Sequence, residues 1–202
     1  LRHPLLTLCR NGTNLGFVKT CNWALRQALP DDVVLLNSDT EVTSGWLERL
    51  VEAAYSRAEI GSVTPLTNNG EIASVPRFLK ENSIPPGYNL EQYAILIEAA
   101  AAREYVEIPT CVGFCTYLKR EMLDRVGLFD EESFGLGYGE ENDLSCRAQE
   151  AGFVDILDDA TYIYHKGRTS FQGHKLELSR RNLAILEQKH PGYQQRIHDF
   201  AL

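Results

Sequence analysis

The sequence lacks a hydrophobic run of the roughly 20 residues that a membrane-spanning helix requires. Its most apolar helical stretch, residues 93–102, is interrupted by Glu98, so we expect no segment that spans a bilayer. Positive charge is also scarce, because 20 Lys and Arg stand against 28 Asp and Glu in 202 residues, a formal net charge of −8. A chain of this charge is a poor partner for a phosphate backbone, so we expect no nucleic-acid ligand.

Cysteines are few, odd in number and without a Cys-x-x-Cys pair, so they predict no disulfide scaffold and favour a reducing, cytoplasmic compartment. The apolar context of Cys111 and Cys115 favours buried packing over a redox or metal role. An initiator methionine is missing, and residues 5–8 are too short for the core of a secretory signal. We therefore expect a fragment, with part of the active site upstream of Leu1.

Internal repeats, low-complexity tracts and long linkers are also absent, which favours one domain over residues 1–202. Helical patterns alternate with short apolar runs, which predicts an α/β fold. The later strands follow one another without intervening helices, so we expect a mixed sheet. We predict helices at 17–29, 44–57 (capped by Ser44), 91–103, 120–126, 140–151 and 174–190, and strands at 33–36, 60–64, 106–118, 154–157 and 161–164.

The first chemically informative motif is Asn37-Ser38-Asp39, directly after the apolar run 33–36. That run is typical of a strand buried on both faces, whose carboxyl end is an edge where ligands bind. A carboxylate there suits Mg²⁺ or Mn²⁺ shared with substrate phosphates. The alternative is that Asp39 only begins a turn. The Pro- and Gly-containing residues 66–89 predict a long loop that is a candidate binding element.

The second motif is a glycine-rich loop, residues 135–139, that leads into a helix beginning with Glu140, Glu141 and Asp143. One or two acids at a helix N-terminus are explained by the helix dipole. Three are less easily explained in that way. Adjacent carboxylates raise one another's pKa, and this is how a carboxylate becomes a general base near neutral pH.

The third motif is His165-Lys166-Gly167-Arg168, after a predicted strand. A histidine at a strand end is suited to completing a metal site. The two cationic side chains that follow it are suited to binding phosphate oxygens. The alternative is a histidine with an ordinary hydrogen-bonding role. The other four histidines have no such context, and we expect them at the surface: His3, His174, His190 and His198.

Taken in order, these motifs resemble those of the family 2 glycosyltransferases with the GT-A fold, above all bacterial rhamnosyltransferase-like members. The resemblance covers nearly the whole chain. It rests on Asn14 to Phe17 with Asn22, Leu35 to Asp39 with Trp46-Leu47, Val112 to Cys115, Gly139 to Arg147, and His165 with Ser170-Phe171. It implies a Rossmann-like mixed sheet with helices on both faces, lacking its first strand or strands, in one partial domain that begins within the nucleotide-binding half.

The resemblance also implies an activity, namely inverting transfer of a sugar from a nucleotide-diphosphate donor to a hydroxyl of a glycan or lipid-linked acceptor, in cell-surface polysaccharide synthesis. Glu141 would be the catalytic base, with Asp143 as the alternative, and Arg147 would form a structural ion pair. Asp39 and His165 would bind Mn²⁺ or Mg²⁺, with Asn37 in place of a first acid. Gly139 and Glu140 would lie at the acceptor, and the donor would contact Asn14, Gly16, Asn22, Asn37, Asp39, Gly113, Lys166 and Arg168.

Two other functions are weighed against this one. A truncated, non-catalytic module that binds glycans or a partner is the main alternative, because the start of the nucleotide site would lie upstream. A metal-dependent nucleotidyltransferase or phosphohydrolase is disfavoured, since there is neither a Walker-type glycine loop nor a second acid beside Asp39. We further expect peripheral association with the inner face of the membrane. We also expect a homodimer that forms through an exposed sheet edge.

Overall fold

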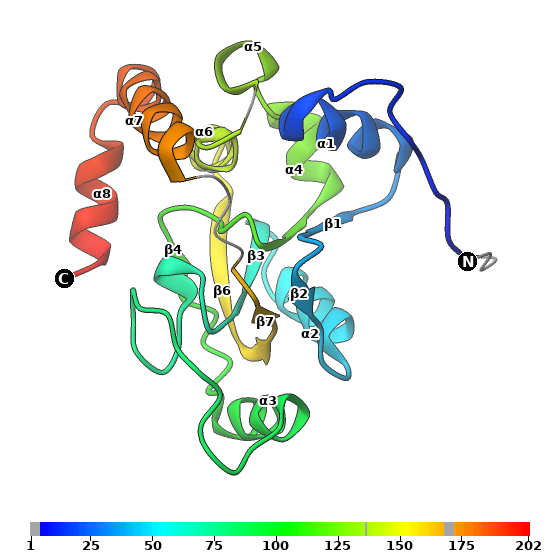
Figure 1. The fold of residues 1–202 in the computed structure, drawn as a ribbon, viewed down its shortest axis with the longest axis vertical. Coiled ribbons are helices and arrows are strands. Elements are labelled where there is room, and N and C mark those ends of the chain that lie inside the picture. The colour runs from blue at the N-terminus through cyan, green and yellow to red at the C-terminus, as the bar shows by residue number, and fades with distance from the viewer. Residues whose placement is uncertain (1–4, 136, 168–171) are drawn as a thin grey trace.

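The computed structural model describes residues 5–135, 137–167 and 172–202, with side chains in the last range from residue 177 onward. Helices and strands alternate along most of the chain (Figure 1). The helices are α1 (Gly16–Gln27), α2 (Trp46–Ala54), α3 (Leu90–Ala100), α4 (Arg120–Val126), α5 (Glu131–Phe134), α6 (Glu140–Glu150), α7 (Gln172–Lys189) and α8 (Tyr193–Phe200), with a 3₁₀ helix at Glu71–Ala73. The strands are β1 (Val33–Leu36), β2 (Thr40–Glu41), β3 (Ile60–Leu66), β4 (Glu107–Ile108), β5 (Cys115–Leu118), β6 (Val154–Tyr162) and β7 (Tyr164–His165).

Strands β1, β5, β3, β6 and β4 form one sheet in that order, and β2 pairs with β7 in a separate two-stranded sheet. Strands β3 and β6 run parallel, whereas β1–β5, β3–β5 and β4–β6 are antiparallel. The sheet is therefore mixed, as the sequence predicts. In the small sheet Thr40 lies opposite His165, so the segments that follow β1 and β6 meet there.

The two faces of the large sheet pack against different helices. On one face, α1, α4, α6 and α7 share a core with β5 through residues such as Leu25, Met122 and Leu186. On the other face, Leu50 of α2 packs with buried residues of β3, β5 and β6. Helix α3 contacts the end of β6 through Tyr162. Helices thus cover both faces, as expected (Figure 1).

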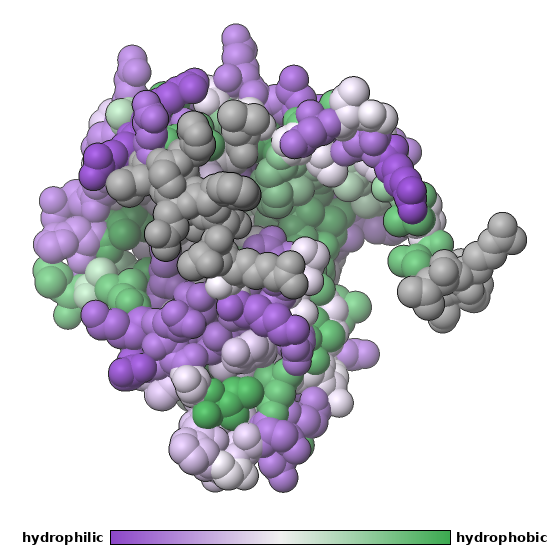
Figure 2. All heavy atoms as spheres, in the orientation of Figure 1, coloured by the Kyte–Doolittle hydropathy of each residue, from purple (hydrophilic) through white to green (hydrophobic). Residues whose placement is uncertain are grey.

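The prediction that residues 33–36 form a strand buried on both faces is wrong. Strand β1 lies at one end of the described sheet, its residues are half-buried, and Leu36 is 42% exposed. An apolar run shows that a strand packs against a core, but it does not show how many neighbours the strand has. Figure 2 shows hydrophobic residues in a hollow below α1, beside this strand.

Most helices lie where the sequence predicts them, and α4 has the predicted bounds. Helix α2, however, begins after Gly45, whose φ is 69°, and the side chain of Ser44 makes no capping hydrogen bond. Helix α3 begins with a capping box between Asn89 and Gln92. The two strands predicted at 154–157 and 161–164 are one continuous strand, β6, followed by β7. Across the described ranges, no helix is long and apolar enough to cross a membrane.

Candidate functional site

The acid pair Glu140 and Glu141 begins α6, directly after a tightly bent loop. Gly137, Tyr138 and Gly139 all have positive φ, at 105°, 69° and 111°. Glycine adopts this conformation at little cost, whereas Tyr138 needs support from its surroundings. A Cβ at Gly139 would lie 3.0 Å from the Phe134 ring, so this position requires glycine for space as well. The predicted glycine-rich loop therefore has a defined backbone conformation that fixes where Glu140 and Glu141 begin α6.

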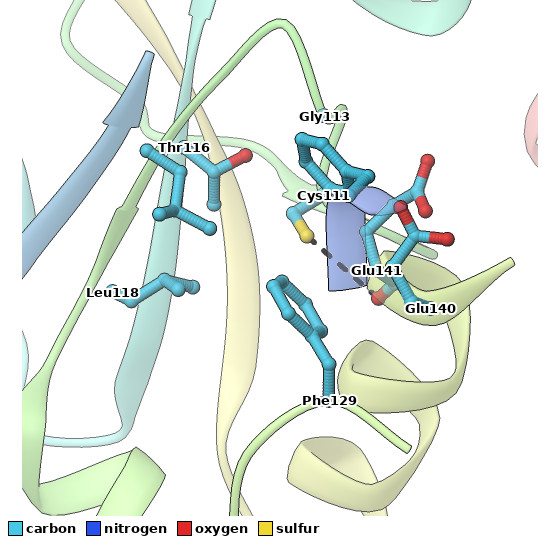
Figure 3. Close-up of a pocket in the computed structure, with 9 residues that line it drawn as sticks. Cys111, Gly113, Thr116, Leu118, Phe129, Glu140 and Glu141 are labelled. Carbon is cyan, nitrogen blue, oxygen red and sulfur yellow. Dashed lines mark hydrogen bonds between the residues drawn. The ribbon is translucent and has the colours of Figure 1, made fainter. Parts of the chain in front are cut away.

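Both carboxyl groups line a small pocket, together with apolar side chains from α1, β1 and β5. Figure 3 shows them side by side, with Gly113 close by and the Phe129 ring between them and Leu118. Oε2 of each glutamate is buried and has no hydrogen-bond partner among the described residues. The pocket is lined by Phe17, Leu35, Cys111, Gly113, Thr116, Leu118, Phe129, Glu140 and Glu141.

This environment favours protonated carboxyls. Burial, and then the charge of Glu141, raise the pKa of Glu140 to about 8. Burial also raises the pKa of Glu141 above its ordinary value. Since both groups leave water for an apolar surrounding, each ionises with difficulty, and the two are tightly coupled. The pair thus has the raised pKa that suits a general base working near neutral pH.

A second pair of candidate residues lies on the small sheet. His165 Nε2 is 3.5 Å from Asp39 Oδ1, and His165 Nδ1 is 2.7 Å from the carbonyl oxygen of Asn69. A carbonyl only accepts hydrogen bonds, so Nδ1 donates to Asn69 and Nε2 faces Asp39. A neutral imidazole nitrogen beside a carboxylate fits a divalent cation. In the described part of the chain, no group of three or more His, Cys, Asp or Glu is placed to hold a metal, so any cation there would share its shell with a ligand.

Two adjacent residues connect the acid pair to the Asp39–His165 pair. A Cβ at Gly113 would lie 3.4 Å from Glu141 Oε1, so the backbone there contacts the carboxyl group. The next residue, Phe114, stacks on the His165 ring with centroids 5.4 Å apart and planes 22° apart. Its carbonyl also accepts a hydrogen bond from the Asn37 amide at 2.9 Å. The second and third motifs of the sequence, and the residues after β1, therefore belong to one site.

Other predicted donor contacts lie in different settings. Asn14 is exposed and accepts a hydrogen bond from the amide of Gly16 at the start of α1, at 2.9 Å. Lys166 is half-exposed and forms an ion pair with Glu41, at 2.7 Å. Arg168 lies outside the described residues.

Asn22, another residue expected to contact the donor, is engaged within the protein. Its side chain is buried and donates to the Phe129 carbonyl and to Glu131 Oε1, each at 2.8 Å. It also accepts from the Phe129 amide at 3.0 Å. Both amide atoms are engaged, so Asn22 fixes α1 to the segment before α5.

Asp143, the alternative base, lies in a different setting from the acid pair. Its side chain is 0% exposed and its carboxylate contacts Arg147, Lys189 and His190. The structural ion pair expected of Arg147 is therefore present. His190, expected at the surface, is buried between Asp143 and Glu150. Burial opposes ionisation of Asp143, but hydrogen bonds from Lys189, His190 and Arg147 lower its pKa below the ordinary value.

Sequence reasoning missed two buried asparagines that support the site. Asn182 of α7 donates to the carbonyls of Gly137 and Tyr138, both at 2.8 Å, and so holds the loop before the acid pair. Asn68 exchanges two hydrogen bonds with the backbone of His165. Asn68 lies in a predicted loop and Asn182 in a polar helix, so their positions gave no signal that they bind distant backbone.

Comparison with known proteins places this geometry in a family. The profile of Glycosyl transferase family 2 matches residues 2–127. The chain belongs to glycosyl transferase family 2. The matched range ends before α6 and β7, so the acid pair and His165 lie beyond it.

Two curated relatives of this chain come from mycobacteria. An uncharacterised protein of Mycobacterium bovis is 28% identical over 81% of this chain and 60% of its own length. The N-acetylglucosaminyl-diphospho-decaprenol L-rhamnosyltransferase of Mycobacterium tuberculosis is 24% identical over 84% of this chain and 62% of its own length. The chain thus spans about three fifths of the length of these relatives.

Solved structures share the fold. GalNAc-T7 with UDP, GalNAc and Mn²⁺ aligns with 93% of this chain and 39% of its own, with a TM-score of 0.61 and 15% identity. The mannosyltransferase PcManGT of Pyrobaculum calidifontis, in complex with GDP-Man and Mn²⁺, aligns with 96% of this chain and 50% of its own, with a TM-score of 0.58 and 18% identity. The fold is therefore GT-A, and family and fold together support a role in glycosyl transfer.

Proposed function

We propose that this chain carries the catalytic site of an inverting glycosyltransferase. It would transfer a hexosyl group from a nucleotide-diphosphate donor to a hydroxyl of a glycan or lipid-linked acceptor, in cell-surface polysaccharide synthesis. The observation that carries the proposal is the Gly113–Phe114 step, because Gly113 contacts Glu141 and Phe114 stacks on His165. A candidate proton acceptor and a candidate cation site thus lie beside two adjacent residues, which supports transfer from a diphosphate donor.

Glu141 acts as the base in this proposal. Its carboxylate takes the proton of the acceptor hydroxyl while that oxygen attacks the anomeric carbon, and the bond to the diphosphate oxygen breaks with the electron pair leaving on the diphosphate. Attack from the side opposite the leaving group inverts the anomeric carbon. Glu140, with a pKa of about 8, keeps its proton at neutral pH and lies with Gly139 on the acceptor side. A positioned base contributes about 10²- to 10⁴-fold.

Asp39 and His165 are the residues that would hold a divalent cation, Mn²⁺ or Mg²⁺. When bound, such a cation neutralises the charge of the departing diphosphate. The donor would lie along Asn14, Gly16, Asn37, Gly113 and Lys166, with Arg168 next in sequence. Two solved structures with the same fold hold UDP or GDP-Man together with Mn²⁺, which supports this assignment.

The acceptor and the cellular setting are proposed from one relative. The Mycobacterium tuberculosis rhamnosyltransferase is named for a decaprenol-linked acceptor. A lipid-linked acceptor would require the enzyme to work at a membrane surface, and we propose the cytoplasmic face. Few cysteines, all of them free, are compatible with a reducing compartment.

The test is thermal unfolding of the chain with and without Mn²⁺, across UDP-, dTDP- and GDP-sugars. A ligand that binds only the native state raises the melting temperature by mass action. We expect a rise that requires both Mn²⁺ and one class of nucleotide, and that disappears in the Asp39→Ala variant. If no donor raises the melting temperature of this chain or of a version extended upstream, the non-catalytic binding module becomes the correct interpretation.

A further inference from the structure

The segment 67–82 is part of the loop 66–89 that the sequence offers as a candidate binding element, and it is hydrogen-bonded to His165. Asn68 is 2% exposed. Its Oδ1 accepts a hydrogen bond from the His165 amide at 2.7 Å, and its Nδ2 donates to the His165 carbonyl at 2.9 Å. One side-chain amide therefore pairs with both backbone groups of His165, as a neighbouring strand would.

The residue after Asn68 fixes the imidazole ring. The Asn69 carbonyl lies 2.7 Å from His165 Nδ1, which places the proton on Nδ1 and leaves the lone pair on Nε2. Phe114 stacks on the ring and limits its rotation. The side chain of Asn69 lies against Gly167, where a Cβ would collide with Asn69 Nδ2. The backbone on both sides of Lys166 is thus held by the two asparagines.

A third asparagine keeps this segment closed. Asn82 is buried, and its backbone amide donates to the Asn68 carbonyl at 2.9 Å. Its side chain donates to the carbonyls of Arg77 and Lys80, at 3.0 and 2.8 Å, and accepts from the Arg77 amide. The segment is therefore cross-linked by hydrogen bonds and positions Asn68 and Asn69 rigidly.

We propose that Asn68 is a positioning residue for cation binding: with the Asn69 carbonyl, it holds His165 so that Nε2 faces Asp39. This inference rests on the proposed function, because it assumes that Asp39 and His165 bind the cation. Its physical basis is that a metal-binding histidine is oriented by the hydrogen bond of its other nitrogen, and removal of such a partner weakens metal affinity about 10- to 100-fold.

The test uses Asn68→Ala, with Asn89→Ala as the matched control. Asn89 is an asparagine whose side chain caps α3 and bonds the Gln92 amide rather than the His165 backbone. Nitrogen-15 NMR of histidine-labelled, metal-free protein at pH 8 reports which nitrogen of His165 carries the proton. Titration with Mn²⁺ in the presence of UDP reports the affinity for the cation.

In the wild type and in Asn89→Ala, we expect the proton on Nδ1 and the same Mn²⁺ affinity. In Asn68→Ala, the backbone of His165 loses both of its hydrogen bonds to the Asn68 side chain, so the ring shifts from the Asn69 carbonyl. We therefore expect a mixture of tautomers and a 10- to 100-fold weaker Mn²⁺ affinity. If Asn68→Ala does not fold, Asn68→Asp replaces it, since that variant keeps the shape and the acceptor but loses the donor to the His165 carbonyl.

A folded Asn68 variant with an unchanged tautomer and unchanged Mn²⁺ affinity overturns the inference. The proposed function fails separately if His165→Ala and Asp39→Ala both leave Mn²⁺ binding unchanged. In that case the tautomer of His165 in Asn68→Ala still decides whether Asn68 and Asn69 orient the ring.

Discussion

Lys189 Nζ lies 2.6 Å from Asp143 Oδ1, and this ion pair joins the last turn of α7 to the first turn of α6. Arg147 and His190 contact the same carboxylate, at 2.8 and 3.0 Å. The acidic side chains at the start of α6 therefore lie in two different environments. Asp143 is surrounded by cations inside the protein, whereas the adjacent pair Glu140 and Glu141 lines a pocket and has unsatisfied oxygens.

Replacement of Asp143 by Asn should destabilise the fold. Removal of one partner from a buried ion cluster leaves the other charges uncompensated and costs about 3–5 kcal/mol. The folded-state pKa of Asp143 is lowered, so its stabilisation is fully present above the pKa of an unfolded aspartate and is lost as pH falls toward the folded value. Urea denaturation at neutral and acidic pH measures both effects.

The control for Asp143 is Glu150→Gln, because the Glu150 side chain is 66% exposed and also contacts His190. It should change the free energy of unfolding by less than about 1 kcal/mol. Equal losses in the two variants would show that the buried cluster has no special role.

Replacement of Glu141 by Gln should remove most turnover and leave donor affinity nearly unchanged. The variant keeps the size of the side chain but loses the proton acceptor, so we expect kcat to fall about 10²- to 10⁴-fold. Asp39→Ala should lose both turnover and donor affinity. Steady-state kinetics and donor calorimetry distinguish the two, and near-normal turnover in Glu141→Gln would remove Glu141 as the base.

Replacement of Glu140 by Gln should change how stability depends on pH. The pKa of Glu140 is about 8 in the folded protein against 4.5 for an ordinary glutamate. The unfolded chain therefore releases this proton first, and native stability falls as pH rises from about 4.5 through 8. Glu140→Gln has no proton to lose, so its melting temperature should fall less between pH 5 and about pH 9. Parallel pH profiles would show that Glu140 ionises normally.

Replacement of Asn182 by Ala should lower kcat and leave donor affinity unchanged. The variant leaves the Gly137 and Tyr138 carbonyls without their donor, so the loop relaxes and the acid pair moves. Asn182→Asp keeps the volume but lacks the donor, and should be at least as impaired. The control is Leu183→Ala on the same helix, since Leu183 is exposed. Full activity in Asn182→Asp would mean that packing alone holds the loop.

The elements best predicted from sequence are those whose limits depend on local chemistry. Helix α4 ends at Gly127, whose φ is 83°, and α6 begins after Gly139. The acid pair could be recognised as a candidate base because three acids in four residues exceed what helix capping explains. The Asp39–His165 pair followed from the resemblance to a family rather than from periodicity.

What the sequence did not predict depends on contacts between distant segments. His190 is buried because α6 supplies two carboxylates around it, and nothing in its own neighbourhood indicates this. Strand β1 was expected to be buried on both faces because an apolar run looks alike in fully and partly buried strands. The role of Asn68 likewise requires knowledge that β7 returns beside the segment after β3.

Strand β6 lies between β3 and β4, and it begins at Val154. During synthesis β6 therefore leaves the ribosome only after most of the chain, and its pairing with β3 at such long sequence separation is slow. A fragment ending at residue 127, where the family match ends, would expose the edge of β3 and deprive β4 of the strand with which it pairs. The limits of the family match are therefore not the limits of a unit that folds, and shortened versions should aggregate unless they retain β6.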